Sequence, residues 1–150
     1  MMHLRRATEA DLPAIVALLA DDPLGAARED ASLPLDRAYA KAFAAIDADP
    51  NQLLAVADAD GQILGCLQIT FLPGLSRKGA WRGQIESVRV AQAARGMGLG
   101  KTIFEWAIET CRAQGCSLVQ LTSDTGRPDA HRFYEALGFV GSHTGFKLTL

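Results

Sequence analysis

The segment IESVRVAQAARGMGLGKT (residues 85–102) joins an apolar strand pattern to a helix through a turn with three alternate glycines. Isoleucine and valine at 85–90 are typical of a strand. From Leu99 to Arg112 the apolar residues recur at the three- and four-residue spacing of a helix, with charged residues off that stripe. The segment therefore predicts a strand, a glycine turn and an amphipathic helix in succession.

Such a turn is a natural site for an anion. The first turn of a helix leaves backbone N–H groups unpaired and carries partial positive charge. Gly96, Gly98 and Gly100 let a phosphate approach the backbone without meeting a Cβ, and Arg95 and Lys101 add flanking cations. We expect a phosphate group to bind here.

Two nucleotide motifs fit this turn incompletely. The dinucleotide pattern GxGxxG fails, because its third glycine would fall at Lys101 or Ile103. The P-loop pattern GxxxxGK[ST] finds its last three positions in Gly100-Lys101-Thr102, but its first glycine would be residue 95, which is arginine. A P-loop also begins a parallel βαβ domain, whereas several antiparallel-looking strands come before this turn. A P-loop-like nucleotide site stays as an alternative.

The rest of the chain predicts a mixed α/β (α+β) domain. Thr8 and Asp11 resemble a capping box at the start of a helix that ends at Ala20. Asp129 can cap a late helix that Gly138 terminates. Further helices are expected at 35–46, 99–112 and 130–137, and strands at 3–6, 52–57, 63–71, 84–90, 117–122, 139–142 and 146–150.

Composition excludes several classes of protein. The 150 residues are the length of one ordinary domain, 49% hydrophobic and 21% charged, and the net charge of −2 predicts no broad attraction to nucleic acid or an anionic membrane. No apolar run approaches the ~18 residues of a membrane span, and no signal peptide is recognisable. Three cysteines without CxxC spacing favour a reduced, cytoplasmic location, and no His/Cys/carboxylate cluster suggests a metal.

The turn RGMGLG (95–100) resembles the [QR]-x-x-G-x-[GA] pyrophosphate loop of the GNAT (Gcn5-related N-acetyltransferase) family in every fixed position. The resemblance extends to LRRATEADL (4–12), to the strand 85–90 and to HRFYEALGF (131–139). It implies a mixed, mostly antiparallel sheet with helices on both faces. Two middle strands, Gln84–Val90 and Ser117–Thr122, would splay apart.

The resemblance also implies acetyl-CoA as the acyl donor. Its pantetheine arm would enter the gap between the splayed strands and bond the backbone near Val88 and Val90. Its pyrophosphate would lie on the amides of Gly96, Gly98 and 100–102, the last of these being Thr102. Relatives often carry an asparagine shortly before the final helix, where this chain has Arg127-Pro128.

Three side chains are candidates for the chemistry. Glu86 is the candidate base that deprotonates an amine, and alternation along a regular strand would place it on the same face as Val88 and Val90, unless a β-bulge intervenes. The resemblance points Tyr134 at the thioester sulfur. Hydrogen bonding to the thiolate suits Tyr134 better than full proton transfer, since tyrosine has a pKa of about 10 and a thiol about 8.5. His131 would line the coenzyme A channel or serve as a structural histidine.

Together these features predict an N-acetyltransferase in which a primary amine of a small molecule, or of a protein, attacks acetyl-CoA directly in a ternary complex. The acceptor pocket is expected between the first two helices and the loop Pro73–Gly83, whose cations and Trp81 could engage an anionic or aromatic group. A non-catalytic acyl-CoA-binding regulator is the other alternative. Relatives are commonly dimers, so a homodimer is compatible with the resemblance.

Overall fold

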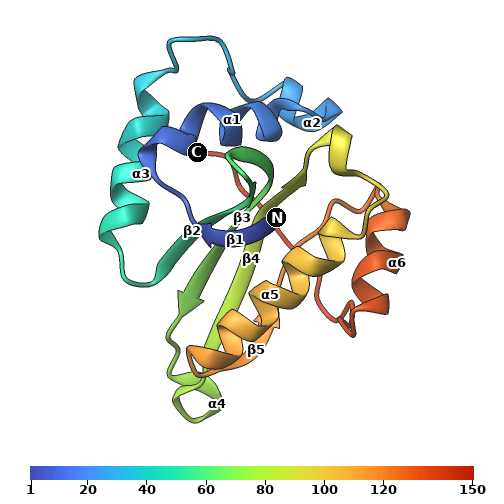
Figure 1. The fold of residues 1–150 in the computed structure, drawn as a ribbon. Coiled ribbons are helices and arrows are strands. Elements are labelled where there is room, and N and C mark those ends of the chain that lie inside the picture. Colours follow the sequence, from blue (N-terminus) through green and yellow to red (C-terminus); the bar gives the residue numbers. More distant parts are fainter.

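The computed structural model describes residues 1–150 and contains one open five-stranded sheet with helices on both faces (Figure 1). The strands follow one another across the sheet in chain order. The first four are antiparallel neighbours, and β5 lies parallel to β4. The strands are β1 (Met2–Arg6), β2 (Gln52–Ala59), β3 (Gln62–Leu72), β4 (Trp81–Val90) and β5 (Cys116–Gln120). This is the mixed, mostly antiparallel architecture that the sequence predicted.

The helices divide between the two faces. Those before β2 cover one face, and α5 covers the other. The helices are α1 (Leu12–Ala20), α2 (Pro23–Ala26), α3 (Arg37–Ala48), α4 (Ser76–Gly79), α5 (Leu99–Ala113) and α6 (Pro128–Ala136), with 3-10 turns η1 (Glu9–Asp11) and η2 (Gln92–Ala94).

The alternation of β2 shows why its apolar run is continuous. Ala55 and Ala57 pack with α5, whereas Leu54 and Val56 pack with α1 and α3, so both faces of the strand are buried. A strand covered on both sides needs apolar residues at every position. This central strand therefore ties the two layers of helices to one sheet.

Strand β4 contains the main irregularity of the sheet. Its register with β3 shifts between Cys66 and Gln68, and Ser87 has a left-handed backbone with φ of 57°. This is a β-bulge, in which an extra residue reverses the facing of the positions that follow it. On the other side, β4 pairs with β5 from Trp81 only as far as Gln84, whose partner is Gln120. The splay of the strands expected at 84–90 and 117–122 is thus confirmed, although β5 is the edge strand of the sheet, and it begins just before the bulge.

An arginine cluster holds β1 to its surroundings. Arg5 forms a two-pronged ion pair with Asp11, with Nη1–Oδ2 and Nη2–Oδ1 distances of 2.8 and 3.0 Å, and its Nε lies 2.9 Å from Oδ2 of Asp58. Asp11 also accepts from the N–H of Thr8 at 2.7 Å, as a capping box requires. The hydrogen bonds from Arg5 hold the pKa values of Asp11 and Asp58 below their usual range.

Several predicted boundaries were wrong. Strand β4 begins at Trp81, inside the segment expected to be a loop, because Trp81–Gln84 pair with β5. The last helix begins at Pro128 with Arg127 as its N-cap, and Asp129 pairs with Arg132 instead of capping. The strands expected at 139–142 and 146–150 do not form, since no backbone hydrogen bond involves a residue after Phe139.

The Arg5 cluster makes stability depend on pH in a defined direction. Because the folded carboxyls have lowered pKa values, their contribution is complete above the unfolded value of about 4 and is lost as pH falls through the folded values. We expect Asp11→Asn to lower the melting temperature by several degrees at pH 7. The difference from wild type should shrink steadily below pH 4. Thermal melts at a series of pH values measure this.

Asp60→Asn is the matched control, since Asp60 is an exposed carboxylate in the turn that follows Asp58. It should change the melting temperature little at any pH. A constant difference between Asp11→Asn and wild type from pH 7 down to pH 2 would show that the cluster does not act through this charge.

Candidate active site

The glycine turn forms an open hollow at the start of α5. Gly96 and Gly98 have φ of 81° and 75°, a left-handed conformation that L side chains rarely adopt. Nothing lies within 4 Å of where a Cβ would stand on either residue. The hollow measures about 240 Å³ and is lined by Val90, Ala94, Arg95, Gly96, Gly98, Leu99, Gly100, Lys101 and Phe133. It is space that a ligand can occupy against the backbone.

The helix N-terminus faces this hollow. Helix α5 begins at Leu99, and no side chain caps it, so its first N–H groups stay available to an anion. The two flanking cations are engaged with carboxylates. Lys101 Nζ lies 2.6 Å from Oε1 of Glu105, and Arg95 Nη2 lies 3.7 Å from Oδ2 of Asp21. Both side chains are more than half exposed, and an incoming anion can compete for them.

The environment of the turn differs from that of a P-loop. The strands that precede β4, from β1 to β3, are antiparallel neighbours in the sheet, and only β5 is parallel to β4, whereas a P-loop begins a domain of parallel strands. Beyond Gln84, β4 has no strand partner on the β5 side. Val88 and Val90 lie on this unpaired stretch, packed against the α5 layer of the core. The backbone oxygens of Val88 and Val90 accept from the side chains of Arg89 and Arg95, at 3.0 and 3.4 Å. A gap without a second strand therefore leads up to the glycine turn.

The bulge changes where Glu86 points. Ile85 before it, and Val88 and Val90 after it, all pack on the α5 side. Glu86, next to Ile85, must lie on the opposite face. The prediction that Glu86 shares a face with the two valines was wrong, because it assumed a regular strand. Glu86 is exposed and takes part in no ion pair or side-chain hydrogen bond.

Tyr134 belongs to an aromatic cluster on the α5 side. Its ring centroid lies 5.6 Å from Phe104, 5.7 Å from Phe133 and 6.2 Å from Phe139, all in edge-to-face arrangements. The residue is half-buried, and its hydroxyl has no protein partner. The packing fixes the ring while the hydroxyl is left free to bond a ligand. Glu86 and Tyr134 thus flank the splayed strands from opposite faces of the sheet.

His131 is held by the loop before its own helix. Its Nε2 lies 3.0 Å from the backbone oxygen of Asp124, which ties the start of α6 to the chain that leaves β5. Of the two roles expected for His131, lining the coenzyme A channel or serving as a structural histidine, this contact favours the second.

A cluster of charged side chains lies on the face of the sheet opposite α5, and the sequence analysis did not predict it. Arg89 Nε lies 2.9 Å from Oδ2 of Asp22, close enough for an ion pair, although its N–H is not aligned for a hydrogen bond. The pKa of Asp22 is lowered first by the backbone N–H of Gly25, and further by the charges of Arg89, Arg28 and Arg127. Three arginines from separate segments thus lie near one carboxylate. No local pattern indicates this, because the residues meet only in the fold.

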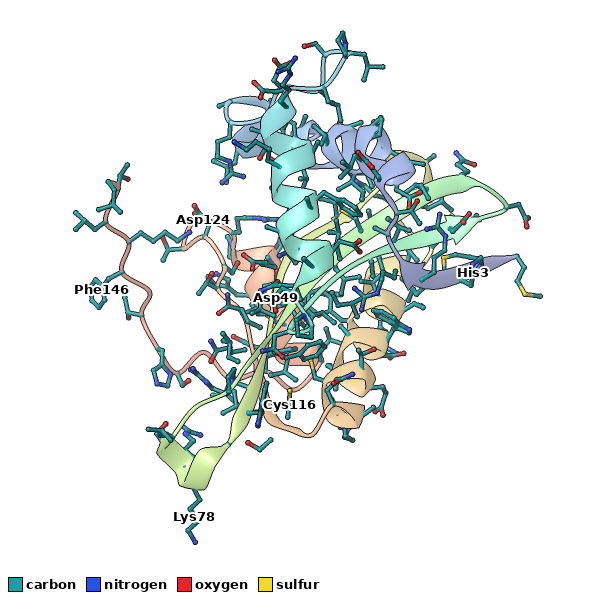
Figure 2. All side chains as sticks on the ribbon, turned by 90° about the vertical axis from the view of Figure 1, so that its left-hand side faces the viewer. His3, Asp49, Lys78, Cys116, Asp124 and Phe146 are labelled. Carbon is teal, nitrogen blue, oxygen red and sulfur yellow. The ribbon has the colours of Figure 1, made fainter.

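The loop Pro73–Gly83 does not join the first two helices. It contains α4 and lies at one end of the molecule, while α1 and α3, which correspond to the first two helices expected from the sequence, lie toward the other (Figure 1), and Lys78 marks the same far end in Figure 2. The ten-residue strand β4 separates this loop from the glycine turn. An acceptor pocket shared by that loop and the first helices is therefore not formed within one chain.

No three His, Cys, Asp or Glu side chains lie close enough together to hold a metal ion. None of the helices combines the length and the apolar character needed to cross a bilayer.

Comparisons with known proteins agree with this geometry. The model of the acetyltransferase (GNAT) family matches residues 12–139. The aminoalkylphosphonate N-acetyltransferase of Salmonella typhimurium is 32% identical over 99% of this chain and 91% of its own length. The glucosamine-6-phosphate N-acetyltransferase of Arabidopsis thaliana has the same fold, with a TM-score of 0.81 at 22% identity over 99% of this chain and 98% of its own.

A crystal structure from Bacillus halodurans C-125, described as that of a transcriptional regulator, is more similar still. It is 49% identical, covers 100% of both chains and has a TM-score of 0.97. With the family match over most of its length, the open turn and the splayed strands, the chain belongs to the acetyltransferase (GNAT) family.

Proposed function

We propose that this protein transfers the acetyl group of acetyl-CoA to a primary amine of a small molecule by direct attack. The observation that carries the proposal is the open, positive-φ glycine turn at the N-terminus of α5, next to the gap between β4 and β5. A gap lined by unpaired strand backbone suits an extended amide-bearing arm. The turn beyond it suits a diphosphate.

In this proposal the donor lies across both features. The amides of Gly96, Gly98, Gly100 and Lys101 bind its pyrophosphate, with Arg95 and Lys101 exchanging their carboxylate partners for phosphate oxygens. The amide of Thr102, which was also expected to bind it, donates to the backbone oxygen of Gly98 at 3.1 Å. The backbone near Val88 and Val90 bonds the pantetheine arm. The fit is supported by the space around Gly96 and Gly98, which nothing in the protein fills.

The two candidate catalytic groups act from opposite faces. Glu86 takes a proton from the acceptor ammonium, directly or through a water, and the free amine attacks the thioester carbonyl. A strand amide near Val88 donates to the oxyanion, and the carbon–sulfur bond breaks as the carbonyl re-forms. The hydroxyl of Tyr134 donates a hydrogen bond to the leaving thiolate. As the carbonyl re-forms, the nitrogen loses its second proton and the thiolate takes one up, so the products are an acetamide and free coenzyme A. No covalent enzyme intermediate is needed.

The charges around Asp22 suggest that the acceptor carries an acidic group. Arg28, Arg89 and Arg127 lie near Asp22, so cations outnumber the carboxylate on the face that Glu86 also occupies. The Salmonella relative is named for an amine that bears a phosphonate. We infer an aminoalkyl acid, with the phosphonate or phosphate near Arg89 and the amine toward Glu86.

One comparison favours a second candidate function. Because the Bacillus relative is described as a transcriptional regulator, binding of acyl-CoA without catalysis remains the alternative. A cytoplasmic location and a homodimer also remain predictions.

Removing the candidate catalytic groups should slow transfer while binding persists. We expect Glu86→Gln and Tyr134→Phe each to lower kcat by roughly 100-fold at pH 7, since each removes a proton acceptor or a hydrogen-bond donor used in the transition state. A free-thiol release assay with a panel of aminoalkyl phosphonates and uncharged-chain amines measures the rate. Calorimetry measures acetyl-CoA affinity, which should be the same in both variants as in the wild type. Glu109→Gln, on an exposed position of α5, is the control.

The same assay decides between the two functions. Tight acetyl-CoA binding without amine-stimulated thiol release from any acceptor would favour the regulator. Stabilisation by ATP and Mg²⁺ but not by coenzyme A would overturn both.

A methyl group in the glycine turn should weaken donor binding. Gly98→Ala places a methyl group in the space where we propose that phosphate binds, and it forces alanine into a left-handed backbone conformation. We expect acetyl-CoA affinity to fall about tenfold or more, which is ~1.4 kcal/mol. Gly115→Ala is the matched control, because Gly115 has φ of 89° just beyond the other end of α5. It should lower the melting temperature similarly and leave affinity unchanged; equal affinities for both variants would contradict a phosphate site at this turn.

The proposed acidic group can be tested through Arg89. Loss of one charge-assisted hydrogen bond is worth about 1.5–3 kcal/mol, so Arg89→Gln should lower kcat/KM for an aminoalkylphosphonate by roughly 10- to 100-fold. The value for an uncharged amine of equal length should change little. Arg112→Gln, on the exposed surface of α5, controls for net charge. An equal loss on both substrates would mean that Arg89 only positions Asp22.

A further inference from the structure

Two residues in the bulge of β4 have no partner in either neighbouring strand. The register with β3 passes from a pair at Glu86 to a pair at Arg89, with a single residue of β3 between the two partners. Ser87 and Val88 therefore share one position, and the pairing of β4 with β5 has ended before them. Backbone groups that lose their ladder partners inside a protein require other partners.

The thiol of Cys66 reaches into this bulge from β3. Its Sγ lies 3.5 Å from the backbone oxygen of Ser87, within hydrogen-bond distance for sulfur. Cys66 is 1% exposed and packs with Leu54 and Val56 in the layer of the core under α1 and α3. The left-handed residue of the bulge, Ser87, thus has its carbonyl bonded by a buried side chain where the neighbouring strand offers no partner.

This thiol keeps its proton, as a hydrogen-bond donor must. Burial raises the pKa of Cys66 to about 12, although the charge of Arg89 and the backbone N–H of Arg89 act in the opposite direction. The sulfur is therefore a neutral S–H group at pH 7. It also lies between the two backbone groups that flank Val88, namely the carbonyl of Ser87 before it and the N–H of Arg89 after it.

The contact with the carbonyl fixes the direction of the next N–H group. The carbonyl of Ser87 and the N–H of Val88 belong to one planar trans peptide, in which the two bonds point in opposite directions. Because the carbonyl oxygen is turned toward Cys66, the N–H of Val88 points away from Cys66. This N–H belongs to the strand amide for which we proposed the role of donor to the oxyanion.

We propose that Cys66 is a positioning residue, whose S–H group holds the Ser87–Val88 peptide so that the N–H of Val88 meets the oxyanion of the tetrahedral intermediate. The inference rests on the proposed acetyl transfer. Cys66 lies buried beneath the bulge and acts through the backbone, without touching donor or acceptor. A hydrogen-bond donor stabilises developing charge only when it is aimed at it, so a rotation of this peptide lowers the rate.

Two substitutions at this position separate the hydrogen bond from the packing. Cys66→Ala removes the donor, whereas Cys66→Ser supplies a hydroxyl that can donate to the same carbonyl but costs more to bury. Both variants should melt at a lower temperature than wild type. In the thiol-release assay we expect kcat to fall roughly tenfold in Cys66→Ala and to stay within about threefold of wild type in Cys66→Ser. KM for acetyl-CoA should not change, because the glycine turn is untouched.

Cys111→Ala is the matched control, because it deletes the same atoms from the other layer of the core. Cys111 is fully buried in the α5 layer, and its thiol lies near that of Cys116 at the start of β5. This variant should lose a similar amount of thermal stability and keep the kcat of wild type.

The S–H stretching band tests the hydrogen bond without any acetyl transfer. A thiol that donates to a carbonyl has a lower stretching frequency than a free thiol, because the bond weakens S–H. The difference between the Raman spectra of wild type and Cys66→Ser isolates the band of Cys66. We expect this band at the frequency of a bonded thiol.

A Cys66 band at the frequency of a free thiol would overturn the proposal, as would a wild-type kcat in Cys66→Ala. An equal loss of kcat in Cys66→Ser, or in Cys111→Ala, would also overturn it, because the rate would then follow core packing. A wild type that releases no thiol with any amine would overturn the proposed function and this inference together. The kinetic outcomes above require an active wild type, so a failure of the positioning role is distinct from a failure of the proposed function.

Discussion

The site depends on two features of β4, the end of its pairing with β5 and the bulge that follows. Up to Gln84 this strand is an ordinary member of the sheet, paired with β3 and β5. Past that point the pairing with β5 ends, and the left-handed residue Ser87 inserts a bulge. The two events together separate β4 from the edge strand β5 and place Glu86 and Val88 on opposite faces. A regular strand would have closed the gap and placed both on one side.

The bulge is held by packing on both layers. Before it, Ile85 anchors β4 to α5, and after it Val88 and Val90 return to the same layer of the core. On the other face, Arg89 reaches Asp22 at the start of α2. A left-handed non-glycine residue is strained by about 1–2 kcal/mol, and such strain persists only where the surroundings determine the backbone. The position of this strain at the gap is consistent with a functional role.

The donor and acceptor sides of the site have different physical origins. The donor side is made of backbone: the amides at the start of α5, the glycines without Cβ, and the free edge of β4. The acceptor side is made of side chains from separate segments, with Arg28, Arg89 and Arg127 near Asp22. Backbone sites depend on a short local pattern, whereas the acceptor side depends on how α2, β4 and the loop before α6 are placed. The donor side is therefore recognisable in the sequence, whereas the acceptor side forms only in the folded chain.

The sequence alone determined the elements that arise from local chemistry. The capping pattern at Thr8 and Asp11 located α1, periodicity located α5, and glycines marked the turn and the ends of α5 and α6. The apolar runs of β2 and β3, joined by a turn, predicted strands within two residues of their observed ends. Residues 95–100 and 131–139 pointed to the family for the same reason, since a backbone anion site needs specific residues in consecutive positions.

Only the tertiary structure decided the rest. The facing of Glu86 depends on the bulge, which lets Ile85 and Val88 lie on the same face of β4 although they are three residues apart. The cap of α6, the early start of β4 and the arginines around Asp22 depend on neighbours distant in the sequence. Residues 146–150 have the pattern of a strand, yet they do not form one within this chain, because a strand needs a partner for its backbone and the alternation of side chains cannot say where that partner lies.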